Sequence, residues 1–208
     1  EDDVIDDEWW KKTVRESVLR RKNFFVRDSD TNTFRIIHGE ADMLGGVAAD
    51  VYGRVIRIVI SARVAFEHRA LIVSEIDSLL HPDIIILNTD VSFCGIESLK
   101  EVVEYYKNGV QFTPDKSLDE ITVRESGLYY SFIPGTGQKS GFFCDQRENR
   151  NRFEKYVRGA VVFDGCCYTG SFTLHALRGG AICVDAVDSS ADALHLLSKN
   201  VRLNEEKE

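Results

Sequence analysis

The residues best suited to chemistry lie at 160–172, in the run AVVFDGCCYTGSF. Five apolar or acidic residues end at Asp164, a loop of small and polar residues follows, and a helix is expected to begin near Ser171. Open α/β sheets build nucleotide pockets in this way, with a small-residue loop between the carboxyl end of a strand and a helix. The segment therefore predicts a site for a nucleoside-type cofactor.

The same loop argues against a phosphate-binding site. It contains neither GxGxxG nor GxxxxGK[ST], and only Gly165 and Gly170 are expected to supply unusual backbone torsions. A carboxylate at Asp164 would also repel a pyrophosphate. An adenosine group without phosphate fits this loop better.

A second strand is predicted to end in an acidic residue. The apolar run AICVDAV at 181–187 has the character of a buried parallel strand, and Asp188 follows it, 18 residues beyond Gly170. Related folds place a carboxylate near this spacing to bind ribose hydroxyls. Ser189 and Asp192 form an S-x-x-D helix start. An ordinary βαβ unit with a solvated acid at the strand end explains the spacing equally well.

The motifs around these strands resemble those of a known family. GQKSGFFCDQRENR at 137–150, the DGCCYTGSF loop and the VDSSADAL stretch are similar to the signature of class I S-adenosylmethionine-dependent 23S ribosomal RNA methyltransferases. Members of this family combine a PUA domain, a middle EEHEAD domain and a Rossmann methyltransferase domain. The stretch FRIIHGEADMLGGVAADVYG at 34–53 resembles the middle domain, and the likeness extends from Trp9 to Asn204. Met43, Gly45, Cys166 and Cys167 depart from the family pattern.

The resemblance implies S-adenosylmethionine as the cofactor. Gln146 and Arg147 are suited to its methionine carboxylate, and Asp145 with Glu148 has the D-x-x-E form of a capping box for the helix that follows. The residues expected to bind the cofactor are Phe143, Gln146, Arg147, Asp164, Cys166, Cys167, Tyr168, Thr169, Gly170, Asp188 and Ser189.

The resemblance also implies a fold class, an α+β middle domain followed by the first part of an α/β Rossmann-like methyltransferase domain. The expected division is an acidic tail at 1–8, a connector helix with an EEHEAD-like domain at 9–136, and the N-terminal portion of the Rossmann domain at 137–208. Trp10, Val14 and Val18 share one face of the connector helix. Further helices are expected at 65–80 and 98–107, and a hairpin is expected to turn at 125–127.

Length limits the expected activity. A Rossmann methyltransferase needs about six or seven strands, and the family's later base-handling motifs have no counterpart in these 208 residues. We expect a fragment without the PUA domain and the second half of the methyltransferase domain, inactive alone and without an assignable catalytic residue. The parent activity implied is base methylation of large-subunit rRNA at cytosine C5. A non-catalytic RNA-binding or assembly module and a small-molecule methyltransferase are the alternatives.

Charge gives mixed information about RNA. The net charge of −8 counts against strong RNA binding by the chain as a whole, because phosphate contacts dominate such affinity. Basic residues nevertheless cluster locally, although a solvated helix face explains the first cluster equally well. The residues expected to contact ribosomal RNA are Lys11, Lys12, Arg15, Arg20, Arg21 and Lys139. A homodimer is a further possibility.

The remaining composition points to a soluble intracellular protein. The five cysteines show no CxxC pair, which favours reduced thiols and no metal site, and GEAD at 39–42 is better explained by turn chemistry than by metal binding. No apolar run is long enough for a membrane span, and the acidic start differs from a signal peptide. A cytoplasmic location is expected, with an organellar one left open.

Overall fold

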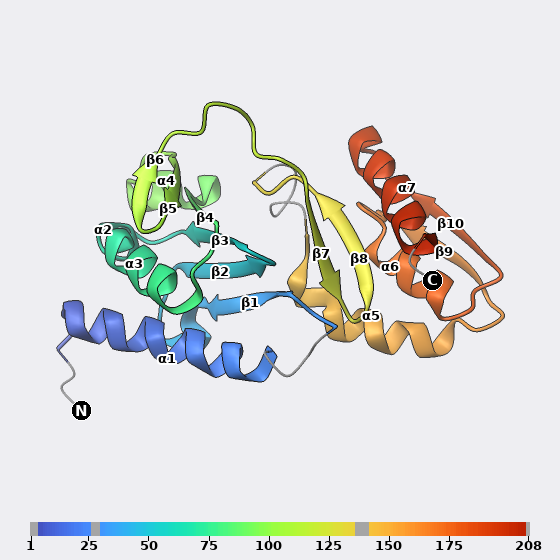
Figure 1. Cartoon of the computed structure of the whole chain (residues 1–208), viewed down its shortest axis with the longest axis horizontal. Coiled ribbons are helices and arrows are strands. Elements are labelled where there is room, and N and C mark those ends of the chain that lie inside the picture. The colour runs from blue at the N-terminus through green and yellow to red at the C-terminus, as the bar shows by residue number, and fades with distance from the viewer. Residues whose placement is uncertain (1–3, 26–29, 136–141, 207–208) are drawn as a thin grey trace. The chain divides into compact units, whose positions relative to one another are not determined.

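The computed structural model describes residues 4–25, 30–135 and 142–206 (Figure 1). The chain forms two compact units, Glu1–Leu118 and Asp119–Glu208. This division falls earlier than the boundary expected at residue 136. Each unit has its own sheets and helices.

The first unit is built on a six-stranded mixed sheet in the order β1-β2-β3-β4-β5-β6. Strands β3 and β4 are parallel, because two helices carry the chain between them, and the other neighbours are antiparallel. Its elements are α1 (Asp7–Phe25), β1 (Thr33–His38), the 3₁₀ helix η1 (Gly39–Asp42), β2 (Val47–Tyr52), β3 (Val55–Ile60), α2 (Arg63–Glu67), α3 (Arg69–Leu80), β4 (Ile84–Thr89), α4 (Val91–Glu97), β5 (Val103–Lys107) and β6 (Val110–Phe112).

Helices α1 and α3 pack on one face of this sheet and enclose the core. The predicted stripe of Trp10, Val14 and Val18 is confirmed, since all three side chains are buried in one cluster with Ile58 of β3 and Ile72 of α3. Among the described residues, no helix has both the length and the apolar character that a membrane span requires.

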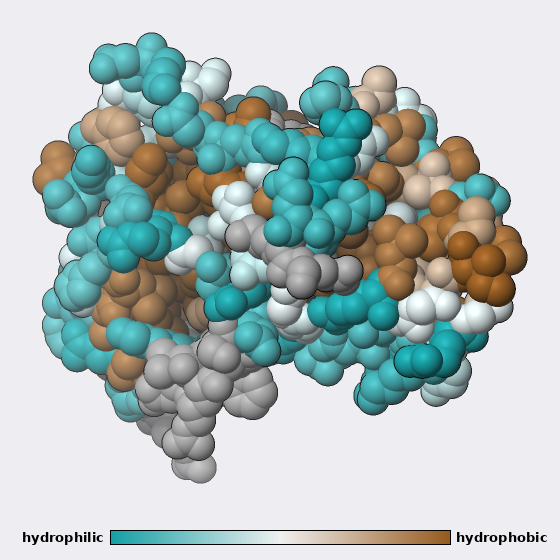
Figure 2. Space-filling model, turned by 45° about the vertical axis from the view of Figure 1, so that its right-hand side comes forward, coloured by the Kyte–Doolittle hydropathy of each residue, from teal (hydrophilic) through white to brown (hydrophobic). Residues whose placement is uncertain are grey.

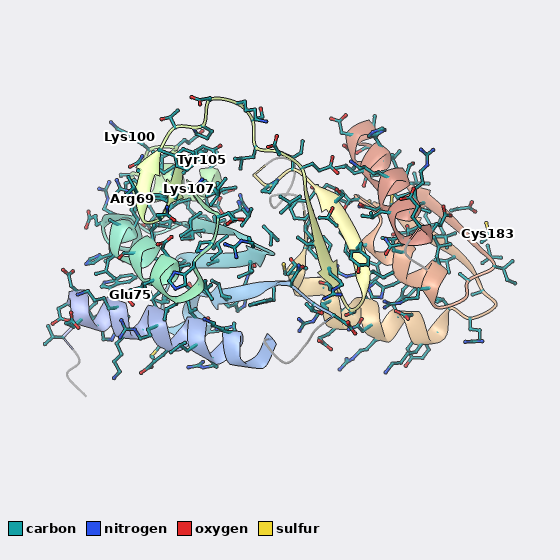
Figure 3. The ribbon with its side chains drawn as sticks, in the orientation of Figure 1. Arg69, Glu75, Lys100, Tyr105, Lys107 and Cys183 are labelled. Carbon is teal, nitrogen blue, oxygen red and sulfur yellow. The ribbon has the colours of Figure 1, made fainter. Side chains whose placement is uncertain are left out.

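The prediction of a helix at 98–107 was wrong. Helix α4 ends at Glu97, and residues Val103–Lys107 form strand β5, which pairs with β4. Val103, Tyr105 and Tyr106 are β-branched or aromatic, and such residues favour strands when a neighbouring strand is available. Figure 3 shows Tyr105 on this strand, while Arg69 projects from α3 and contacts Glu104 of β5.

The GEAD turn is held by its own carboxylate, as predicted. Asp42 accepts hydrogen bonds from the His38 backbone N–H at 2.6 Å and from Arg21 at 2.8 Å. Burial alone would raise the pKa of Asp42, but these hydrogen bonds lower it below its usual value. In the described part of the chain, no three His, Cys, Asp or Glu side chains gather closely enough to hold a metal ion.

The second unit contains a hairpin and a separate parallel strand pair. Its elements are β7 (Ile121–Glu125), β8 (Leu128–Phe132), the 3₁₀ helix η3 (Cys144–Gln146), α5 (Arg147–Phe153), the 3₁₀ helix η4 (Glu154–Tyr156), β9 (Val161–Gly165), α6 (Ser171–Arg178), β10 (Cys183–Val187) and α7 (Ala191–Glu205). The predicted hairpin is confirmed, with Ser126 and Gly127 both at positive φ in its turn.

Two asparagines of α7 attach the hairpin to this unit. Asn200 accepts a hydrogen bond from the Ser131 N–H at 2.7 Å, while Asn204 both accepts from the Tyr129 N–H and donates to the Tyr129 carbonyl at 2.8 Å. These amides satisfy backbone groups of β8 that the hairpin itself leaves open. The compact unit therefore begins before the hairpin and not after it.

Strands β9 and β10 were expected to be buried, and this was wrong for the described structure. Val161 and Phe163 of β9 are 71% and 72% exposed, and Val187 of β10 is 52% exposed. Figure 2 shows brown, hydrophobic surface over the second unit. Only two strands pair in this sheet within the described residues, so part of its apolar surface lies uncovered.

Candidate cofactor site

The loop between β9 and α6 has an unusual backbone. Cys166, Tyr168 and Gly170 have positive φ values of 61°, 50° and 84°, whereas Gly165 does not. The expectation that Gly165 supplies a special torsion was therefore wrong, and two non-glycine residues do so instead. Gly170 is also required sterically, because a Cβ there would lie 2.6 Å from Cγ of Leu197.

Asp188 holds this loop against the end of β10. Its Oδ2 accepts a hydrogen bond from the Tyr168 N–H and its Oδ1 accepts one from the Ser190 N–H, both at 2.9 Å. These hydrogen bonds lower the pKa of Asp188, so the side chain is a carboxylate at neutral pH. Helix α7 is capped by Ser190, whose Oγ accepts from the Ala193 N–H, and not by the predicted Ser189.

Asp164 connects the end of β9 to helix α6. Its Oδ2 accepts a hydrogen bond from the Thr173 hydroxyl at 2.6 Å, and Thr173 is buried. The loop is further fixed by Asn200, which donates to the Thr169 carbonyl at 3.1 Å. The two strand-end acids therefore lie beside one loop, because β9 and β10 are adjacent parallel strands.

A cavity of about 780 Å³ opens next to this loop. Its size falls within the range of small-molecule sites, about 300–1,000 Å³. It is lined by Phe143, Gln146, Arg150, Asp164, Cys166, Cys167, Tyr168, Ser171, Phe172, Val187, Asp188, Ser189 and Ser190.

Three of the residues expected to bind the cofactor do not line this cavity. Thr169 is buried and contributes its carbonyl to Asn200, and Gly170 packs on Leu197. Arg147 bonds to its neighbour Glu148, with Nε 3.2 Å from Oε1. The α5 helix begins at Arg147 with Gln146 at the cap position, one residue later than the expected cap at Asp145.

The sequence did not predict Arg150, which among the described residues is the only cation that lines the cavity. Ser171, Phe172, Val187 and Ser190 were missed too, although each lies within a few residues of a predicted one. Arg150 follows Arg147 by one turn of α5, and that helical spacing was the available signal. With Asp164 and Asp188, the described part of the lining carries one positive and two negative side chains.

Aromatic rings form one wall of the cavity. The ring of Phe143 meets that of Tyr168 edge to face, with centroids 5.4 Å apart and an interplanar angle of 85°. This is a favourable geometry for two aromatic rings. Phe143 precedes α5 and Tyr168 belongs to the loop, so the contact joins the two segments that border the cavity.

The cysteines in this region are free thiols. Cys166 is exposed in the loop, whereas burial raises the pKa of the Cys167 thiol to about 11 and keeps it protonated. Cys183 lies at the start of β10 (Figure 3) and does not line the cavity.

All the basic residues expected to bind RNA except Lys139 lie on α1, where most form ion pairs. Arg15 bonds to Glu75 of α3 at 2.9 Å, and Arg21 bonds to Asp42 (Figure 3 labels Glu75). Arg20 lies 3.6 Å from Asp42, Lys11 pairs with Glu8, and Lys12 is exposed. Lys139 lies outside the described residues.

Comparison with known proteins gives sequence and structural relatives. A ribosomal RNA large subunit methyltransferase of Deinococcus radiodurans is 30% identical over 97% of this chain and 49% of its own length. The ribosomal RNA large subunit methyltransferase I of Alteromonas mediterranea is 33% identical over 98% of this chain and 49% of its own length. No protein-family model matches the chain.

Solved structures share the fold. A protein assigned as a SAM-dependent methyltransferase from Streptococcus mutans has a TM-score of 0.80 and 21% identity, over 99% of this chain and 51% of that chain. A structure of a protein assigned as a methyltransferase and complexed with SAH also has a TM-score of 0.80, with 20% identity over 99% of this chain and 50% of that chain. The chain spans about half the length of the curated relatives it matches. In sequence it is similar to large-subunit ribosomal RNA methyltransferases, and over its own length it shares the fold of the two solved structures.

Proposed function

We propose that this chain is part of an S-adenosylmethionine-dependent methyltransferase that modifies large-subunit ribosomal RNA. The observation that carries the proposal is the cavity at the carboxyl ends of β9 and β10, bordered by Asp164, Asp188 and the loop between β9 and α6. In α/β sheets this position is the usual ligand site. The similarity to ribosomal RNA methyltransferases over nearly the whole chain supports the choice of cofactor and substrate.

The lining of the cavity fits S-adenosylmethionine. Asp188 uses one oxygen for each backbone N–H, and each oxygen has a further lone pair for a ribose hydroxyl. The two carboxylates suit a ligand with a sulfonium and an ammonium group better than one with phosphates. Gln146 and the Phe143–Tyr168 wall offer an amide and apolar surface for the rest of the molecule.

Bound S-adenosylmethionine supplies an electrophilic methyl group. The residues of this chain would hold the cofactor in one orientation and keep water from its sulfonium, because methyl transfer depends mainly on positioning and exclusion of water. We place no catalytic group in this chain. The same proposal includes methylation at cytosine C5, no activity of these residues alone, and a connector helix with an EEHEAD-like α+β domain at 9–136.

Ribosomal RNA is the proposed partner of the first unit. Lys12 is the exposed basic residue of α1 for which no ion pair is formed in the described structure, and it is the first candidate for a phosphate contact. The alternative function is a non-catalytic RNA-binding module. Two results together would favour this alternative. The chain would bind RNA with an affinity that falls as the salt concentration rises, as phosphate contacts require, and it would not bind the cofactor.

Calorimetric titration of the chain with S-adenosylmethionine tests the cofactor site. Asp188→Asn should weaken the affinity about 10- to 100-fold, because a charged hydrogen-bond acceptor for the ribose is lost. Asp185→Asn is the matched control, since Asp185 lies in β10, three residues before Asp188, is exposed and does not line the cavity. Equal affinity of wild type and Asp188→Asn would overturn the ribose assignment, and no binding by the wild type would overturn the cofactor site.

A further inference from the structure

A buried ion pair borders the cavity, and one of its members, Arg150, is a lining residue. The guanidinium of Arg150 and the carboxylate of Glu125 are 1% and 0% exposed. They form a two-pronged contact, with Nε to Oε1 and Nη2 to Oε2 both at 2.8 Å. Glu125 ends strand β7 of the hairpin, and Arg150 lies in the middle of α5. The contact therefore connects the hairpin to the helix that borders the cavity.

Stability alone gives a weak reason for such a pair. Removing two charges from water costs several kcal/mol per ion, and well-packed apolar residues of similar volume often replace a buried pair without loss of stability. Burial is also the largest influence on the pKa of Glu125, which it raises to about 7 against the lowering effect of Arg150. The arrangement calls for a role that apolar side chains would not fill.

The remaining donors of Arg150 point to that role. Nη2 also donates to the Phe143 carbonyl at 2.8 Å, and Nη1 lies 3.5 Å from the Ser171 hydroxyl. Phe143 and Ser171 both line the cavity. The guanidinium carbon lies 5.2 Å from the ring centroid of Phe142 and 5.9 Å from that of Phe172, so rings also restrict its position.

We propose that Arg150 and Glu125 are positioning residues for the cofactor cavity, an inference that rests on the proposed function. Arg150 fixes the Phe143 carbonyl, which sets the Phe143 ring against Tyr168, and it reaches the first residue of α6. Glu125 holds the plane of the guanidinium. A planar fork of N–H donors can serve the carboxylate and the carbonyl at once, whereas the single ammonium of a lysine cannot reproduce that geometry.

A second ion pair in the same unit supplies the control. Arg178 of α6 contacts Glu154 of η4 with two nitrogens, at 2.6 Å and 3.0 Å. Its partners are partly exposed, at 28% and 24%, and neither residue lines the cavity. Arg178→Lys therefore disturbs an arginine–carboxylate contact of this unit without changing the cavity wall.

The first test compares Arg150→Lys with Arg178→Lys in the full chain, by titration with S-adenosylhomocysteine and by thermal unfolding. We expect Arg150→Lys to weaken binding by about 10-fold or more and Arg178→Lys to leave it within about two-fold. If Arg150→Lys lowers only the unfolding temperature and the folded protein binds as tightly as the wild type, the positioning role is wrong.

A double variant separates positioning from packing. Glu125→Leu with Arg150→Met replaces the pair by apolar side chains, and we expect an unfolding temperature within a few degrees of the wild type. The affinity for S-adenosylhomocysteine should still be lower by about 10-fold, because the guanidinium that donates to the Phe143 carbonyl is then absent. Wild-type affinity in this stable variant would overturn the inference.

Failure of the proposed function is recognised separately. If the wild-type chain does not bind S-adenosylhomocysteine, the function proposed above fails, and amide chemical shifts measured without ligand still test the positioning. Arg150→Lys should shift the amide signals of Tyr168 and Ser171, whereas Arg178→Lys should leave them in place. Unchanged Tyr168 and Ser171 signals in Arg150→Lys would contradict the positioning role.

Discussion

The central strands of the first unit's sheet and the β9–β10 pair of the second unit differ in how far they bury their apolar side chains. In the first unit Ile58 and its neighbours on the sheet are fully buried under α1 and α3, and arginines such as Arg15 pair near the surface. In the second unit Val161 and Phe163 of the sheet are exposed, while Arg150 and Glu125 are buried. The comparison teaches that the central strands of the first sheet are buried in an apolar core, whereas the β9–β10 pair leaves apolar side chains exposed in a unit that buries an ion pair beside its cavity.

Truncation of a sheet residue should have the largest effect and should differ between the units. Ile58→Ala removes a fully buried side chain of β3 and should lower the free energy of unfolding of the first unit by about 2–5 kcal/mol. Both tryptophans, Trp9 and Trp10, lie in α1, so urea unfolding followed by tryptophan fluorescence reports on this unit.

Val161→Ala is the matched change in the second unit. Val161 is 71% exposed, so the free energy of unfolding should change by less than about 0.5 kcal/mol, measured by hydrogen exchange at α6. A loss for Val161→Ala as large as that for Ile58→Ala would show that β9 contributes a core of its own, and the contrast between the units would fail.

Acid should weaken the second unit through a buried histidine. His175 is fully buried, and its Nδ1 lies 2.8 Å from Glu154 Oε2. Burial is the main cause that lowers the pKa of His175, from 6.5 to about 4, and the cations of Arg178 and Arg150 act in the same direction. The native state therefore binds fewer protons than the unfolded state between pH 6.5 and 4. Stability should be complete above pH 6.5 and fall by up to about 3 kcal/mol as the pH drops to 4.

Hydrogen exchange at α6 amides across this pH range checks the prediction. His175→Gln removes the titrating group, so its stability should change less between pH 6.5 and 4 than that of the wild type. An equal pH dependence in the two proteins would assign the effect to other groups, of which Glu154 is the first candidate. Burial alone would raise the pKa of Glu154, but its contacts with Arg178 and His175 lower it.

The sequence predicted those features that depend on near neighbours. Residues spaced four apart gave the buried face of α1, and the strand-end position of Asp188 placed it beside the loop. Features that depend on distant partners were missed. Arg150 needs Glu125, 25 residues away, and Asn200 meets Ser131 across 69 residues. The prediction of a helix at 98–107 failed for the same reason. Strand β5 forms by pairing with β4, and helical spacing within 98–107 carries no information about β4.

Two glycines of the second unit give the smallest and sharpest test of the loop. Gly170 and Gly159 both have positive φ, 84° and 72°, so alanine at either position costs backbone strain of about 1 kcal/mol. A Cβ at Gly170 also lies 2.6 Å from Leu197, whereas a Cβ at Gly159 meets nothing within 4 Å. Gly170→Ala should therefore destabilise the second unit by about 1–3 kcal/mol more than Gly159→Ala. It should also weaken S-adenosylhomocysteine binding, which Gly159→Ala should leave unchanged. The two variants share the same backbone strain, so a loss of binding in both would show that strain anywhere in the second unit disturbs the cavity. A loss in Gly170→Ala alone would show that the cavity depends on the packing of its loop on α7.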